Sequence, residues 1–154
     1  MDVAVPRGLG EIGLTDFAPY LMNRIMGRYN AGFREEMADL GLTTPKARAL
    51  AVLSVVEAPL VGELAVYTVT EQSTLSRALD QLQAEGLIRR EVDAIDSRAV
   101  RVSITDAGRA VFADLWPHMH DAQERMFRGV PAPERQAFVE TLQKMLVNIR
   151  KHEI

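Results

Sequence analysis

Cysteine is absent from this sequence of 154 residues. Its absence excludes disulfides, zinc–thiolate sites and redox sensing by thiols. Long apolar runs are also lacking, since none approaches the roughly 18 residues of a membrane-spanning helix. Residues 1–13 have no apolar stretch of the kind found in secretion signals. We therefore expect a cytoplasmic protein that has no contact with a membrane.

Positive charge is scarce as well. The chain has 18 lysines and arginines against 21 aspartates and glutamates, a net charge of −3. Proteins that bind the phosphate backbone usually carry a basic face, so this balance argues against broad electrostatic binding of nucleic acid. The composition, 47% hydrophobic and 25% charged, is typical of a folded protein. The length fits one domain, with or without a dimerisation extension.

Helical periodicity dominates the first half of the chain. Pro6 and three glycines predict an irregular arm over residues 1–13. Apolar residues then recur at intervals of three and four, which predicts one long helix over residues 16–40 that ends at Gly41. Further helices are expected over residues 44–58, 60–66 and 71–85. Thr68 and Glu71 have the spacing of a capping box in the turn before the last of these helices.

The pattern changes after Gly86. Residues 87–92 and 99–104 are rich in β-branched side chains and are joined by a polar tip, which predicts a β-hairpin. Two more helices are expected, one over residues 106–128 that Thr105 and Asp106 cap, and one over residues 133–151. Helix, turn, helix and hairpin in direct succession form a winged helix-turn-helix. The predicted fold class is therefore mainly α with a small β-hairpin wing.

The helix before the hairpin has two different faces. Leu75, Ala78, Leu79 and Leu82 form one apolar stripe. The other face and the amino end carry polar side chains, among them Gln72, Ser73, Ser76 and Arg77. Glutamine can pair with adenine and arginine with guanine, and a helix amino end attracts phosphate. A solvated helix face would show the same pattern, so both interpretations stay open at this point.

Arginines in the expected hairpin favour DNA binding. Arg89, Arg90, Arg98 and Arg101 could reach sugar-phosphate or a minor groove. Residues 60–104 nevertheless contain five arginines and seven acidic residues, a net charge of −2. Any affinity for DNA must therefore depend on a few well-placed arginines.

Four segments in a fixed order resemble the MarR family of bacterial transcription regulators. They are Gln-Ser-Thr-Leu-Ser-Arg-Ala-Leu-Asp-Gln-Leu at 72–82, Glu-Gly-Leu-Ile-Arg-Arg at 85–90, Asp-Ser-Arg at 96–98 and Ser-Ile-Thr-Asp-Ala-Gly-Arg at 103–109. The sequence departs from the family pattern at Ala99, where another arginine is usual. It also departs at Glu71 and Gln72, where lysine or arginine is common.

The resemblance implies a homodimer that binds double-stranded DNA at a pseudo-palindromic site. Residues 14–40 and 106–154 would form its helical dimerisation region, and residues 42–105 its DNA-binding domain. The implied contacts in the major groove and to phosphates are Gln72, Ser73, Thr74, Ser76 and Arg77. Arg98 would enter the minor groove, supported by Asp96. No cofactor is implied.

A small effector is also implied, because relatives bind phenolic or lipophilic anions between the dimerisation region and the winged domain. Met22, Met26 and Tyr29 are the candidate contacts, although core or dimer packing is the commoner role of such residues. His118 and His120 lie about 200° apart on a helix, which disfavours a metal site and favours a surface or dimer-seam position.

No catalytic constellation is present, so we expect no enzyme. The predicted function is a ligand-responsive transcription repressor. The alternative is a winged-helix module that binds another protein and no DNA. A third interpretation is a dimer that binds a small molecule without regulatory output.

Overall fold

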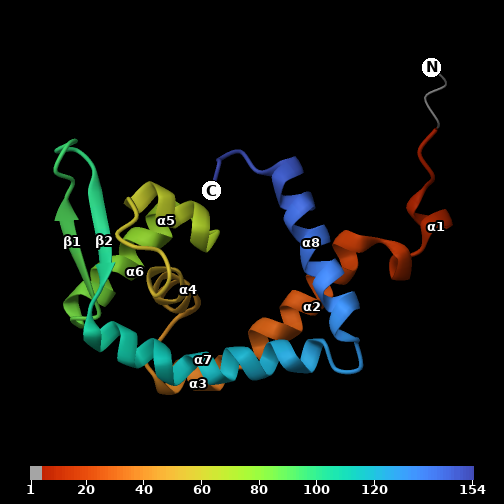
Figure 1. Cartoon of the computed structure of the whole chain (residues 1–154), viewed down its shortest axis with the longest axis horizontal. Coiled ribbons are helices and arrows are strands. Elements are labelled where there is room, and N and C mark those ends of the chain that lie inside the picture. Colours follow the sequence, from red (N-terminus) through yellow and green to blue (C-terminus); the bar gives the residue numbers. More distant parts are fainter. Residues whose placement is uncertain (1–4) are drawn as a thin grey trace.

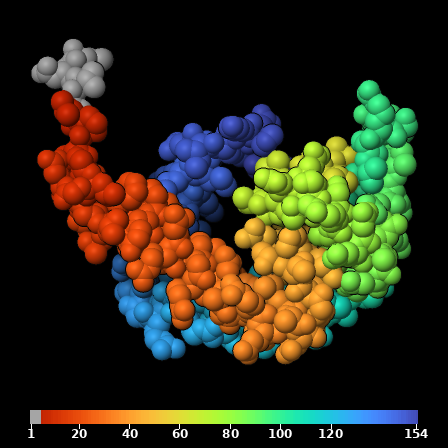
Figure 2. All heavy atoms as spheres, turned by 180° about the vertical axis from the view of Figure 1, so that it is seen from behind, coloured from red at the N-terminus to blue at the C-terminus, as the bar shows by residue number. Residues whose placement is uncertain are grey.

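The computed structural model describes residues 5–154, and the chain forms a U (Figures 1 and 2). Helices and one antiparallel hairpin make up the molecule, which confirms the predicted fold class. The elements are α1 (Leu9–Ile12), η1 (Leu14–Asp16), α2 (Ala18–Ala31), α3 (Arg34–Asp39), α4 (Thr44–Leu53), α5 (Val61–Thr68), α6 (Gln72–Ala84), β1 (Ile88–Val92), β2 (Val100–Ile104), α7 (Asp106–Met126) and α8 (Ala132–Ile149).

One arm of the U is the winged domain, residues 42–105, which contains α4, α5, α6 and the hairpin. The helical base, residues 14–40 and 106–154, forms the floor and the other arm. No helix within residues 5–154 combines the length and the apolar character that a membrane crossing needs.

Buried leucines form the core of the winged domain. Leu50, Leu64, Leu75, Leu79 and Leu82 have no accessible surface. Three of them form the apolar stripe of α6, so the predicted buried face is confirmed. Full burial of a leucine side chain is worth about 1.5–3 kcal/mol, and this set therefore fixes α6 against α4 and α5.

The hairpin has the predicted strands and a regular register, from Ile88 opposite Ile104 to Val92 opposite Val100. A third segment supports β2, because Val102 donates its N–H to the carbonyl of Pro59 at 3.0 Å. The wing, residues 88–104, is therefore fixed to the start of α5 as well as to α6.

Thr105 joins the base of the wing to α7. Its hydroxyl donates to the carbonyl of Gly86 at 2.7 Å and accepts the N–H of Gly108 at 3.1 Å, capping α7 as predicted. A Cβ atom on Gly108 would lie 2.1 Å from the carbonyl oxygen of Leu87. Only glycine allows this close approach of helix and hairpin.

Two predictions for the amino-terminal part are wrong. The arm contains the short helix α1, although residues 1–4 of it lie outside the described part. The expected helix over residues 16–40 is divided into α2 and α3 by a turn at Gly32 and Phe33. Phe33 leaves the helical conformation there and is buried, with its ring edge-to-face against Tyr29 at a centroid distance of 5.1 Å. Tertiary packing overrides the helical periodicity at this point.

The capping box predicted at Thr68 and Glu71 is also wrong. Thr68 is the last residue of α5, and its buried hydroxyl donates to the carbonyl of Leu64 at 2.8 Å. The bond from a capping residue's N–H to a glutamate three residues later occurs instead at the start of α5. There the backbone N–H of Leu60 donates to Glu63 Oε1 at 3.1 Å. The helix expected over residues 44–58 ends at Leu53, and the other helix ends differ from prediction by a few residues.

Candidate nucleic-acid interface

The amino end of α6 is open to solvent. Gln72, Ser73, Ser76 and Arg77 are exposed, and Thr74 is half-buried. The residue before the helix, Glu71, makes no side-chain capping bond. The first backbone N–H groups of α6 are therefore available to an external acceptor.

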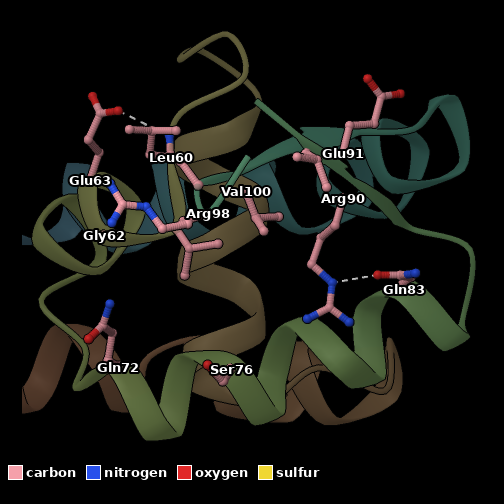
Figure 3. Close-up of a pocket in the computed structure, with 13 residues that line it drawn as sticks. Leu60, Gly62, Glu63, Gln72, Ser76, Gln83, Arg90, Glu91, Arg98 and Val100 are labelled. Atoms are coloured by element: carbon pink, nitrogen blue, oxygen red, sulfur yellow. Dashed lines mark hydrogen bonds between the residues drawn. The ribbon is translucent and has the colours of Figure 1, made fainter. Parts of the chain in front are cut away.

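A groove of about 830 Å³, here called the recognition groove, separates α6 from the wing (Figure 3). Gln72 and Ser76 line it from the helix, Arg98 lines it from the wing, and the start of α5 closes one end. The structure thus brings three of the predicted contact residues to one concave surface. Ser73, Thr74, Arg77 and Asp96 do not line this groove.

Arg98 is the most accessible of the paired arginines in the wing, with 91% of its side chain exposed. One carboxylate oxygen of Asp96 accepts both the backbone N–H of Arg98, at 3.0 Å, and its Nε, at 3.3 Å. Asp96 therefore holds the backbone and the Nε of Arg98, while most of the side chain remains in solvent.

Arg101 anchors the wing to the body of the domain. Its Nε donates to Asp93 Oδ1 at 2.6 Å, and its Nη1 donates to the carbonyl of Ala58 at 2.9 Å. The second oxygen of Asp93 accepts the N–H groups of Asp96 and Ile95. The hydrogen bond from Asp96, followed by that from Arg101, lowers the pKa of Asp93 below its ordinary value. Sequence reasoning missed this anchor, although the hairpin register offered a signal by placing residues 93 and 101 near each other.

Arg90 joins the wing to the recognition helix. Its Nη2 lies 2.8 Å from Asp80 Oδ1, and its Nε donates to Gln83 Oε1 (Figure 3). Arg89, the preceding residue on β1, is exposed. Of the four arginines proposed for DNA contact, three therefore pair with an internal carboxylate, namely Arg90, Arg98 and Arg101, and Arg98 is the most exposed of the three.

Internal hydrogen bonds involve most of the acidic residues of the domain. Five of the seven acidic residues between 60 and 104 accept internal hydrogen bonds, namely Glu63, Asp80, Glu85, Asp93 and Asp96. The partner of Glu85 is Lys46, a lysine only 4% exposed, whose Nζ lies 2.7 Å from Glu85 and 2.9 Å from the carbonyl of Gly41. Lys46 lies outside residues 60–104, so its pairing with Glu85 offsets one of the two excess negative charges of that segment. Pairing with an arginine of the same segment leaves the net charge unchanged.

A second hollow, the interdomain cavity, lies between the helical base and the winged domain and measures about 460 Å³. Met26 and Tyr29 line it, whereas Met22 does not. Burial raises the pKa of Tyr29. The wall is largely apolar, and Arg48 is the one charged side chain among the lining residues. Its Nη1 is 3.5 Å from the carbonyl of Thr68, at the end of α5.

The two histidines of α7 lie apart, as predicted. His118 Nδ1 is 3.6 Å from Glu36 of α3, whereas the ring of His120 lies 5.9 Å from that of Trp116 and its Nε2 is 3.8 Å from Glu124. Over residues 5–154, no three side chains of the His, Asp and Glu type are grouped so that they could hold a metal ion.

Known proteins share this architecture over nearly the whole chain. A solved MarR-family transcriptional regulator from Silicibacter pomeroyi is 62% identical, covers 96% of this chain and 100% of its own, and superposes with a TM-score of 0.92. Bordetella bronchiseptica BpsR, whose DNA binding is regulated by 6-hydroxynicotinic acid, is 28% identical over 83% of this chain and 97% of its own, with a TM-score of 0.72.

Sequence comparison gives the same result. The Escherichia coli transcriptional regulator HosA is 29% identical over 86% of this chain and 97% of its own length. The Pseudomonas putida transcriptional repressor IacR is 24% identical over 88% of this chain and 79% of its own. The family model described as MarR family matches residues 40–99, which include α4, α5, α6 and most of the wing. Together with the winged architecture, these similarities show that the chain belongs to the MarR family of transcription regulators.

Proposed function

We propose that this protein is a homodimeric, ligand-responsive repressor that binds double-stranded DNA at a pseudo-palindromic operator. The observation that carries the proposal is the recognition groove, in which Gln72 and Ser76 of α6 face Arg98 of the wing. With α6 in a major groove, the phosphate backbone would pass along this groove and the wing would reach the adjacent minor groove. Ser73, Thr74 and Arg77 would add contacts to bases or phosphates from the same helix end.

The helical base supports the homodimer. Helices α2 and α8 bury none of their own residues. Their exposed apolar side chains include Leu21, Ile25, Phe138, Leu146 and Ile149. Large exposed apolar surfaces of this kind usually mark an interface. A second copy of the chain packed on α2 and α8 would give the two recognition helices that a two-fold operator requires.

The interdomain cavity supports ligand control. Its apolar wall and the single guanidinium of Arg48 suit a small aromatic or lipophilic anion. Because the cavity contacts both the helical base and the end of α5, a bound ligand would favour one relative position of base and winged domain. We propose that the favoured position separates the two recognition helices by a distance that no longer matches the operator, so that ligand releases DNA.

The test is selection of bound duplexes from a random pool, followed by affinity measurements at several salt concentrations. We expect a two-fold symmetric sequence and an affinity that falls steeply with salt. Arg98→Ala should weaken binding by about 1–3 kcal/mol and reduce the salt slope by about 1. Arg128→Ala, in the turn between α7 and α8, is the matched control and should change neither.

Indifference of the wild type to both sequence and salt would contradict the proposal. The protein-interaction module would then be the better interpretation, and recovery of a stoichiometric protein partner would support it. Repression is tested separately, with a reporter gene placed behind the selected operator, and ligand control by titration of aromatic acids into the DNA complex.

A further inference from the structure

The tip of the wing presents an apolar side chain directly to solvent. Ile95 is 97% exposed, the largest exposed fraction among the large apolar side chains of residues 5–154. It lies in the turn between β1 and β2, which projects from the end of the winged arm (Figure 1). Exposed single apolar residues are common, so its meaning depends on how the turn around it is built.

Hydrogen bonds fix the backbone on both sides of Ile95. Its N–H donates to Asp93 Oδ2 at 3.2 Å, and the N–H of Asp96 donates to the same oxygen at 3.0 Å. The N–H of Ala99 donates to the carbonyl of Asp96 at 3.0 Å, which closes the turn. Asp93 is in turn bonded to Arg101, which anchors the wing on Ala58. The turn therefore holds Ile95 outward in a defined conformation.

The charges around Ile95 leave a surface that suits DNA. Both carboxylates of the turn are engaged, Asp93 with Arg101 and Asp96 with Arg98. The side chain of Arg98 remains 91% exposed three residues after Ile95, against 50% for that of Asp96. The tip thus offers one apolar side chain and one arginine that is more exposed than the carboxylate paired with it.

We infer that Ile95 is a specificity-determining residue that packs in the minor groove beside Arg98 and favours A·T base pairs beneath the wing. The inference rests on the DNA-binding function proposed above. Proteins that enter the minor groove often insert apolar side chains there. A G·C pair adds the guanine N2 amino group to the groove floor, whereas A·T pairs do not. Isoleucine has no acceptor for that group, so burying it against isoleucine leaves a donor unsatisfied.

The experiment compares wild type with Ile95→Ser and Ile95→Val, using duplexes that share the selected half-sites and differ only in the base pairs beneath the wing. Wild type should prefer A·T over G·C there, and Ile95→Ser should lose most of that preference and bind the A·T duplex about tenfold more weakly. Ile95→Val, which keeps an apolar group, should retain the preference. Val55→Ser is the matched control, since Val55 is 83% exposed in the segment that follows α4.

Salt dependence distinguishes Ile95 from Arg98. An apolar contact releases no counterions, so Ile95→Ser should lower affinity with an unchanged salt slope, whereas Arg98→Ala should reduce the slope. If wild type binds DNA but Ile95→Ser keeps the full A·T preference, the inference about Ile95 fails and the proposed function stands. If wild type binds no duplex, both fail.

Discussion

The winged domain and the helical base use similar apolar side chains in different ways. In the winged domain, α6 buries Leu75, Ala78, Leu79 and Leu82, and the strands bury Ile88, Val102 and Ile104. In the helical base, α2 and α8 bury nothing, although both contain isoleucine, leucine and methionine. The winged domain therefore completes a hydrophobic core within one chain, whereas the base leaves exposed apolar surface, on which we propose that a second chain packs.

Because of this difference, substitutions in the two regions should change two different quantities, the free energy of unfolding and the affinity of association. Substitutions in the winged core should change the free energy of unfolding at any protein concentration. Substitutions on α2 or α8 should act mainly on association, because those side chains have few partners within their own chain.

The largest effect is expected in the winged core. Leu79→Ala removes a side chain with no accessible surface and should lower the free energy of unfolding by about 2–5 kcal/mol. Urea unfolding followed by circular dichroism measures the change. Repeating it over a hundredfold range of protein concentration sharpens the comparison, because the loss should be the same throughout. A loss that depends on concentration would show that the winged core is not independent of the dimer.

The next effect concerns an ion pair inside the winged domain, where buried Lys46 of α4 meets Glu85 at the end of α6. Glu85→Ala should lower the free energy of unfolding by about 1–3 kcal/mol more than Lys46→Met does, although Glu85 is the more exposed partner. The reason is that Glu85→Ala leaves the Lys46 ammonium, in a side chain that is 4% exposed, with only the carbonyl of Gly41. Lys46→Met instead leaves the Glu85 carboxylate, in a side chain that is 45% exposed, where water can hydrate it. A double-mutant cycle in urea measures both changes and their coupling. Equal losses would contradict this account of the pair.

A smaller effect on unfolding, but a clear effect on association, is expected in the helical base. Leu146→Ser on α8 changes a residue that is 56% exposed in the single chain and should raise the dimer dissociation constant by about tenfold. Sedimentation velocity over a dilution series measures the constant. Gln143→Ser is a control on the same helix for loss of a polar side chain. An unchanged constant for Leu146→Ser would place the dimer interface elsewhere.

The smallest effect is expected at the wing, in acid. The pKa of Asp93 lies below its ordinary value of 3.8 in the folded chain, because the carboxylate accepts hydrogen bonds from Asp96 and Arg101. The stabilisation that the charged Asp93 side chain gives the folded chain is therefore present above pH 3.8. It is lost as the pH falls through the lowered pKa. Protonation should loosen the turn, seen as a shift of the Ile95 amide resonance. Asp93→Asn should remove this transition, whereas Asp114→Asn on α7 should leave it intact.

The fold was largely predictable because its signals are local. The apolar stripe of α6, the β-branched strands and the Thr105 cap each depend on spacing within about a dozen residues, and each is confirmed. The division of α2 from α3 was not predictable in this way. Phe33 continues the helical period, and its departure from the helix reflects packing in the core and against Tyr29. The sequence pattern predicts a turn at Thr68, because a threonine hydroxyl suits a cap as well as it suits the end of a helix.

The candidate site shows the same limit. Gln72, Ser76 and Arg98 could be named from the sequence because α6 and the hairpin are recognisable, and the structure places them on one groove. The partners of the remaining charges could not be named. Arg90 and Arg101 look like contact residues in the sequence, but their guanidiniums are bonded to Asp80 and Asp93.

The sequence by itself determined the order of the elements, the buried face of the recognition helix and the family resemblance, since all three are patterns along the chain. The tertiary structure alone decided which charged side chains pair with an internal partner and which remain exposed. Ion pairs such as Lys46 with Glu85 join residues 39 positions apart, and no periodicity reports them. For that reason a domain with an acidic formal count can present Arg98 and Ile95 at its tip, with both carboxylates of the turn bonded internally.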